Sequence, residues 1–250
     1  EIAEEIIAEG RADMVSLARP FLADADFVLK SMEGKRDEIN TCIACNQACL
    51  DHTFSMQISS CLVNPRACHE TELNYKPAKE VKKIAVVGAG PAGMAAASIA
   101  AERGHYVTLF ETASELGGQF NMAKVIPGKE EYAETIRYYS VMLEKYKVDV
   151  RLETAATHEN LKAGGYDDII IATGVTPRIP KIEGIHHPKV LTYAEVLYDQ
   201  KVVGPSVALI GAGGIGFDVA EYLAHEGILT SMHTPAFMDE WGVNMDYKNP

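Results

Sequence analysis

The sequence lacks the features that mark membrane and secreted proteins. No apolar run approaches the ~18 residues of a membrane-spanning helix, and the alanine-rich stretch 94–101 is far too short. The first five residues are acidic where a secretion signal would be basic, and no initiator Met is present. These absences predict a cytoplasmic protein without membrane contact, cut from a longer chain.

Basic residues are also few. Lys and Arg number 23 against 35 Asp and Glu, which gives a net charge of −12. Because an acidic surface repels phosphate backbones, we expect no nucleic-acid partner. The hydrophobic share of 47% and the charged share of 23% are ordinary for globular proteins, so disordered and collagen-like chains are excluded.

Cysteine is absent after Cys68, and all five cysteines lie between positions 42 and 68. Cys42, Cys45, Cys49 and Cys61 are spaced as C-x2-C-x3-C-x11-C. In an intracellular protein such a group indicates metal binding or redox chemistry rather than disulfides. Soft sulfur ligands in a compact loop suit a [4Fe–4S] cluster, although the spacing matches neither common ferredoxin pattern. A structural zinc site and disulfides stay open as alternatives, and Cys68 is expected to be an idle thiol.

The expected order of elements predicts an α/β fold. A short helix over residues 1–10 with Gly10 as its C-terminal cap, a buried strand at 14–18 and a helix near 24–31 should form the end of a larger α/β unit. Residues 71–81 resemble a linker. The later segments predict strands at 84–87, 106–110, 148–152, 168–172 and 207–210, and helices at 92–103, 129–146 and 217–226.

A G-x-G-x-x-G pattern at Gly88, Gly90 and Gly93 lies between the strand at 84–87 and the next helix. Glu111 ends the following strand, where a carboxylate can accept hydrogen bonds from ribose hydroxyls. A helix N-terminus behind such a turn faces a pyrophosphate. The pattern therefore predicts a dinucleotide site, and the alternative is a glycine turn that only packs a helix on a strand.

The same pattern recurs at Gly211, Gly213 and Gly216. Two such units predict two different dinucleotides, with plain packing again the alternative. The sequence contains no arginine after Arg178 that would mark a 2′-phosphate site, so it does not distinguish NAD from NADP.

Arg19 follows the strand expected at 14–18. Phosphate sites gather at the carboxyl ends of late barrel strands, so Arg19 is a candidate for a flavin phosphate, with an ordinary surface arginine as the alternative.

Several motifs together resemble one family. They are the run from Asp13 to Asp24 (DMVSLARPFLAD), the cysteine segment from NTCIACNQACLD to CLVNPRACHE, the turn VVGAGPAG, the segment LGGQFNMAKVIPGKEE, and the runs ATGVTPR and IGAGGIGFDVA. They resemble the iron–sulfur flavoenzymes related to old yellow enzyme, and within them the bacterial 2,4-dienoyl-CoA reductase type. Trimethylamine dehydrogenase and clostridial enoate reductase belong to the same group.

The resemblance implies a division into four parts. Residues 1–40 would be the end of an FMN-binding (β/α)8 barrel, and residues 41–80 the [4Fe–4S] segment and a linker. Residues 81–205 would form part of a Rossmann-like FAD domain, and residues 206–250 the start of a Rossmann-like NAD(P) domain. The chain would thus begin near the end of the barrel and stop just inside the pyridine-nucleotide domain.

The resemblance also implies cofactor contacts. Ala18 and Arg19 would contact the FMN phosphate, and the four cysteines named above would hold the cluster. Gly213, Gly214 and Ile215, within the turn from Gly211 to Gly216, would face the NADPH (or NADH) pyrophosphate. The residues implied for FAD are Gly88, Gly90, Ala92, Gly93, Glu111, Gln119 and, through its backbone, Ala156.

By the same resemblance, hydride passes from NADPH to FAD, electrons pass through the cluster to FMN, and FMN reduces a 2,4-dienoyl or enoyl thioester in fatty acid β-oxidation. The proton-donating tyrosine and histidine of the family would lie in the barrel, so no catalytic residue is assigned here. Other readings are an amine dehydrogenase or enoate reductase, an electron-transfer module like the glutamate synthase small subunit, and an unfinished chain that binds nothing. The sequence does not specify an oligomeric state.

Overall fold

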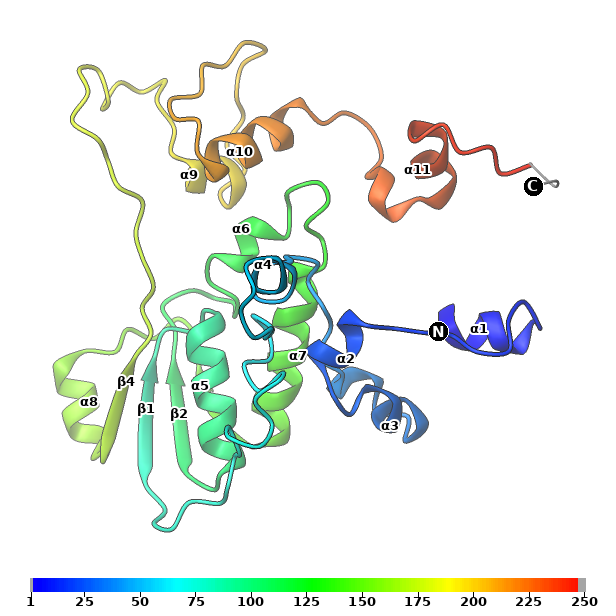
Figure 1. Cartoon of the computed structure of the whole chain (residues 1–250). Helices are drawn as coiled ribbons and strands as arrows, with labels where there is room; N and C mark the ends of the chain where they lie inside the picture. Colours follow the sequence, from blue (N-terminus) through cyan, green and yellow to red (C-terminus); the bar gives the residue numbers. More distant parts are fainter. Residues whose placement is uncertain (1, 247–250) are drawn as a thin grey trace.

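The computed structural model describes residues 2–246. Residue 1 and residues 247–250, at the outer ends of the first and fourth predicted parts, lie outside the described residues. The chain folds around a parallel sheet with helices packed on it, which confirms the predicted α/β class (Figure 1). None of the helices in the described part is long and apolar enough to cross a membrane.

The sheet has four parallel strands in the order β3-β2-β1-β4. This is the order of the first half of a doubly wound nucleotide-binding fold. Because β1 lies between two neighbours, its centre is buried on both faces, as the run of β-branched residues there predicts. The strands are β1 (Lys83–Val87), β2 (Tyr106–Phe110), β3 (Asp149–Arg151) and β4 (Asp168–Ile171).

Two long helices cover the sheet. α5 (Pro91–Glu102) packs on β1, β2 and β4, and α7 (Tyr132–Lys145) packs on α5. The main core lies between α5 and the sheet, where Val86, Met94 and Leu109 are fully buried. The carboxyl ends of the strands therefore open at the level of α6 (Phe120–Ala123), above the sheet in Figure 1.

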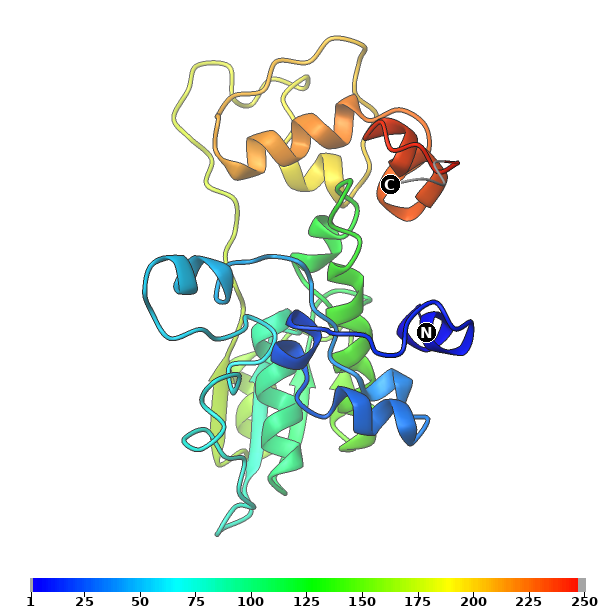
Figure 2. The same cartoon turned by 45° about the vertical axis from the view of Figure 1, so that its right-hand side comes forward.

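The segment that contains α2 and α3 lies beside α7, as does the cysteine segment (Figures 1 and 2). α1 contains no buried residue and stands apart from the other elements in both views, whereas α2 and α3 lie against the rest of the fold. Gly10 ends α1 with a positive φ of 67°, as its predicted role as a cap requires. The elements are α1 (Ile2–Ala8), α2 (Arg19–Ala23), α3 (Phe27–Met32), η1 (Arg36–Glu38) and α4 (Leu50–Phe54).

After β4 an extended segment leads to a second group of helices. In this group α9 and α10 pack together over Val196, Leu197 and Val219, and Ile126 joins them from the region after α6. The elements after β4 are α9 (Tyr193–Leu197), α10 (Gly214–Ala224), η2 (Thr230–Met232) and α11 (Thr234–Glu240). The remaining helix, α8 (His158–Gly164), comes before β4 and lies beside it in Figure 1.

Two predicted strands are wrong. Residues 14–18 and 207–210 are not strands in this structure. A strand needs a neighbour to satisfy its backbone N–H and C=O groups, and within residues 2–246 neither segment lies beside a strand that could pair with it. The apolar composition of each segment favours a strand, but composition alone does not supply a pairing partner.

Candidate functional site

The first glycine turn joins β1 to α5. Gly88 has a φ of 100°, and a Cβ there would lie 2.4 Å from the carbonyl oxygen of Ala172 at the end of β4. A Cβ on Gly93 would lie 1.8 Å from the Gly88 carbonyl oxygen, so the helix approaches the turn more closely than any side chain allows. These two glycines are required by the fold itself.

The space in front of this turn is open. Gly90, the N-cap of α5, has nothing within 4 Å of its Cβ position, and no side chain caps the helix. Because Pro91 has no N–H, Ala92 and Gly93 carry the first backbone donors of α5. The arrangement is that of an anion site at a helix N-terminus, and it fits a pyrophosphate.

Glu111 closes the turn from the next strand. Its Oε2 accepts a hydrogen bond from the Ala89 amide at 2.7 Å, and its Oε1 accepts one from the Ala113 amide at 3.0 Å. Burial opposes ionisation of the carboxyl, but the hydrogen bonds from Ala113, Ala89 and Thr112 outweigh it and the pKa of Glu111 lies below its usual value. The carboxylate is therefore ionised at neutral pH and keeps lone pairs for a ligand hydroxyl.

Two further residues are proposed for FAD, Gln119 and Ala156. The Gly117 amide donates to the Ala89 carbonyl at 2.9 Å, which places the start of α6 against the turn. Gln119, directly before α6, donates through its Nε2 to the Val175 carbonyl at 2.8 Å. Ala156 follows a segment whose Thr154 amide donates to the Glu111 carbonyl at 2.8 Å, but no contact joins the Ala156 side chain to the turn.

The second glycine turn repeats the geometry of the first. Gly211 has a φ of 120°, Gly213 caps α10 with a ψ of 179°, and a Cβ on Gly216 would lie 2.2 Å from the Gly211 carbonyl oxygen. The corresponding N-cap of the first turn, Gly90, also has a ψ of 179°. One difference remains: no atom lies within 4 Å of the Gly211 Cβ position, whereas Gly88 is backed by β4. Gly214 and Ile215 form the exposed first turn of α10.

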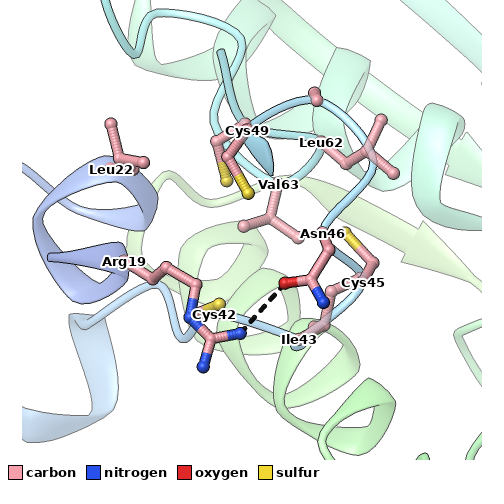
Figure 3. Close-up of a pocket in the computed structure, with 11 residues that line it drawn as sticks. Arg19, Leu22, Cys42, Ile43, Cys45, Asn46, Cys49, Leu62 and Val63 are labelled. Atoms are coloured by element: carbon pink, nitrogen blue, oxygen red, sulfur yellow. Dashed lines mark hydrogen bonds between the residues drawn. The ribbon is translucent and has the colours of Figure 1, made fainter. Parts of the chain in front are cut away.

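The four predicted cysteines line a single pocket (Figure 3). None of them forms a disulfide, so that alternative is wrong in this structure, and Cys68 lies outside the pocket and is exposed. The other residues of the pocket are Arg19, Leu22, Ile43, Asn46, Ala48, Leu62 and Val63. The pocket thus brings together four cysteine side chains that are up to 19 residues apart in the sequence, from Cys42 to Cys61.

Backbone amides point at two of these thiols. The Ala44 amide donates to Cys42 Sγ at 3.4 Å, and the amides of Val63 and Asn64 donate to the Cys61 thiol. Burial, assisted by the facing Cys42 and Cys45, raises the pKa of Cys61 above its ordinary value. A metal that binds Cys61 in place of the thiol proton would overcome this resistance to deprotonation, because a metal-bound thiol is deprotonated outright.

The sulfur donors and the amides directed at them fit an iron–sulfur cluster. Among residues 2–246, no three His, Cys, Asp or Glu side chains are arranged to hold a metal ion as they stand. The fit therefore rests on the shared pocket and the donor type, and a zinc site stays an alternative.

Arg19 lies beside the cysteines rather than at the end of a strand. Its Nη1 donates to Asn46 Oδ1 at 3.1 Å, and the two side chains face each other across the pocket in Figure 3. Ala18 is the exposed N-cap of α2. The predicted contact of Ala18 and Arg19 with an FMN phosphate stays a prediction.

Three residues near the cysteines were not predicted from the sequence to belong to the site. Phe120 and Tyr132 pack on the buried cluster of Ala23, Ile43 and Val63, against which three of the cysteines also pack. The two rings contact each other edge to face, with centroids 4.8 Å apart. Asn40 hydrogen-bonds across the cysteine segment. Asn40 and Phe120 lie in two of the segments that carry the resemblance, and Phe120 directly follows Gln119, but no spacing rule gives any of the three residues a role.

Known proteins resemble this chain over nearly its whole length. A profile of the "Pyridine nucleotide-disulphide oxidoreductase" family matches residues 82–233, so the chain belongs to that family, whose members use FAD and NAD(P)H. The chain is 38% identical over 236 residues to a metal reductase of Desulforamulus reducens and 38% identical over 227 residues to a cinnamate reductase of Clostridium sporogenes. These matches cover 92% and 91% of this chain but 35% and 34% of the relatives.

A solved complex of 2-naphthoyl-CoA reductase with 2-naphthoyl-CoA superposes on 97% of this chain with a TM-score of 0.86 and 36% identity. The match covers 40% of that enzyme's chain. This chain therefore spans a little over a third of the length of the proteins that it resembles.

Proposed function

We propose that this chain is the iron–sulfur and nucleotide-binding part of an NAD(P)H-dependent flavin oxidoreductase that reduces enoyl or dienoyl thioesters. The relatives named for cinnamate and 2-naphthoyl-CoA support this substrate class, because both compounds are conjugated acyl compounds. The relative named for metal reduction supports the redox class without the acyl substrate. A dienoyl-CoA is the finer form of the same proposal.

One observation carries the proposal: a single short segment joins the cysteine pocket to the first glycine turn. Residues 117–123 begin with Gly117 bonded to the turn through Ala89. They continue into Phe120, which packs on the same buried cluster that carries Ile43 and Val63 of the cysteine pocket. A cluster and a flavin held in these two places would be neighbours. If the glycine turn served only packing, or if the cysteines held a purely structural zinc ion, there would be no functional reason for the two sites to lie side by side.

The proposed ligands follow from this geometry. Cys42, Cys45, Cys49 and Cys61 would hold the cluster, and the turn from Gly88 to Gly93 with Glu111, Gln119 and Ala156 would hold FAD. The turn from Gly211 to Gly216 would hold NADPH or NADH, and Ala18 and Arg19 would contact FMN. The division of the chain into residues 1–40, 41–80, 81–205 and 206–250 belongs to the same proposal.

The described residues bind and shield these groups. The flavin supplies hydride and single-electron chemistry when bound, and the cluster accepts one electron at a time. Gly90 would leave room for a pyrophosphate, the first amides of α5 would face it, and Glu111 would accept a hydrogen bond from a ribose hydroxyl. Phe120 and Tyr132 would add apolar surface next to the cluster, because they pack on the same buried residues as Cys42, Cys45 and Cys61.

Cofactor analysis of the purified chain and two variants tests the proposal. After anaerobic reconstitution we expect about four iron and four sulfide per chain, and FAD released on denaturation. Cys61→Ser should abolish the cluster, whereas the matched change Cys68→Ser, outside the pocket, should keep it. One zinc without sulfide, NAD as the only released nucleotide, or the reverse behaviour of the two variants would overturn it.

A further inference from the structure

The Asn40 side chain joins the two ends of the cysteine segment. It is 7% exposed, and its Nδ2 donates to the Val63 carbonyl at 2.7 Å. Asn40 precedes Cys42 by two residues, and Val63 follows Cys61 by two residues. The hydrogen bond thus links the chain around the first predicted ligand to the chain around the last.

Both backbone polar groups of Val63 form hydrogen bonds. Its carbonyl accepts from Asn40, and its N–H donates to the Cys61 thiol. A short antiparallel bridge between Cys61 and Asn64 closes this turn. A displacement of Val63 would therefore also displace the Cys61 sulfur.

Asp24 holds Asn40 in place from behind. Its carboxylate is 6% exposed, and its Oδ2 accepts hydrogen bonds from the backbone N–H of Asn40 at 2.9 Å and from Lys30 Nζ at 2.6 Å. Lys30 also donates to the Glu38 carbonyl at 3.0 Å, which fixes the chain two residues before Asn40. Asn40 is therefore held by residues at the end of α2 (Asp24) and in α3 (Lys30), and not by the cysteine segment itself.

Asn40 Oδ1 is buried and has no hydrogen-bond partner. Leaving a buried acceptor unpartnered costs free energy, so packing alone would favour an apolar side chain of this size. The donor at Nδ2 is the feature of Asn40 that an apolar side chain cannot supply.

We infer that Asn40 is a positioning residue for the cluster. Its hydrogen bond to Val63 sets the position of Cys61 relative to Cys42. This inference rests on the proposed cluster. The Ser60 amide also ties the chain before Cys61 to the Ala48 carbonyl at 2.8 Å, but the Asn40 bond is the one on the far side of Cys61. Without it, the turn that carries Cys61 is held to the other cysteines from one side, and the fourth ligand becomes the weakest. Residues that orient metal ligands in this way change metal affinity by about 10–100-fold when they are replaced.

The variant Asn40→Leu tests the inference because it keeps the volume and removes the donor. Asn74→Leu is the matched control, since Asn74 also donates from Nδ2 to a backbone carbonyl, that of Thr71, in the segment after the cysteines. We expect iron release to a chelator to become about tenfold faster in Asn40→Leu and to stay unchanged in Asn74→Leu. The FAD content should be the same in both.

A second measurement does not need the cluster. In the metal-free protein, alkylation by iodoacetamide followed by peptide mass spectrometry should show Cys61 reacting severalfold faster in Asn40→Leu, with Cys49 unchanged. If the wild type holds zinc instead of a cluster, the proposed function fails while this measurement still tests Asn40. Asn40→Ser, too short to reach Val63, replaces Asn40→Leu if the latter does not fold. Equal iron release and equal Cys61 alkylation in the Asn40 variant and the control would overturn the inference.

Discussion

A single carboxylate, that of Glu111, links the fold and the proposed flavin site. It accepts from the Ala89 amide inside the glycine turn and from the Ala113 amide beyond β2. Because these bonds place the folded pKa below that of an unfolded glutamate, they stabilise the fold above the unfolded pKa. The contribution is lost as the pH falls through the folded pKa.

We predict that Glu111→Gln weakens FAD binding by about 1.5–3 kcal/mol, which is roughly ten- to a hundredfold in Kd. The amide retains one acceptor, but its NH₂ group would face a backbone donor and lose a ribose contact. Isothermal titration of the apoprotein with FAD measures the effect. The control is Glu153→Gln, an exposed residue on the neighbouring segment, which should bind as the wild type does. Equal affinities of the two variants would contradict a ligand role for Glu111.

At the residue scale, the sequence predicted what is local and missed what is distant. Gly88 and Glu111 were found because the turn and the following strand lie close together in the sequence and the motif is short. The pairing of Arg19 with Asn46 spans 27 residues and that of Asn40 with Val63 spans 23. Such contacts depend on how loops fold back, and no spacing rule records them.

At the scale of elements, the same turn occurs twice with different support. The β1 turn rests on β4 through Gly88, whereas the Gly211 turn has no neighbour at the corresponding position. Sequence analysis placed both turns because glycine spacing fixes local backbone geometry. It also predicted a strand before the second turn, at 207–210, and failed there because strand formation depends on a pairing partner.

The glycines of the first turn should separate fold from binding. Gly90→Ala places a methyl group in open space at a negative φ, so we expect the free energy of unfolding to change by less than ~1 kcal/mol while FAD binding is lost. Gly93→Ala forces a Cβ against the Gly88 carbonyl and should destabilise the apoprotein by about 1–3 kcal/mol or more. Thermal unfolding of the apoproteins and FAD titration measure both effects. Normal FAD binding by Gly90→Ala would show that no phosphate approaches the turn.

At the scale of the whole molecule, α7 connects the N-terminal and cysteine segments to the sheet. Arg137 donates through Nη1 to the Asp37 carbonyl at 2.6 Å and through Nη2 to the Ile39 carbonyl at 2.8 Å. Lys145, also on α7, forms an ion pair with Glu38 of η1 at 2.6 Å. These contacts hold the chain just before Cys42 against α7, the helix that packs on α5 and α6.

Replacing Arg137 should therefore loosen one part of the molecule and leave the other intact. Arg137→Ala removes two charge-assisted bonds to backbone carbonyls from a partly buried side chain, a loss of about 1–3 kcal/mol for the attachment of residues 37–41. Hydrogen exchange should become faster at residues 36–70, whereas β1 and β2 keep their protection because their core lies between α5 and the sheet. Arg11→Ala is the control, since Arg11 pairs only locally with Glu9 on the surface. Uniformly faster exchange, reaching β1 and β2, would show that the cysteine segment and the sheet unfold as one unit and that Arg137 is part of their common core.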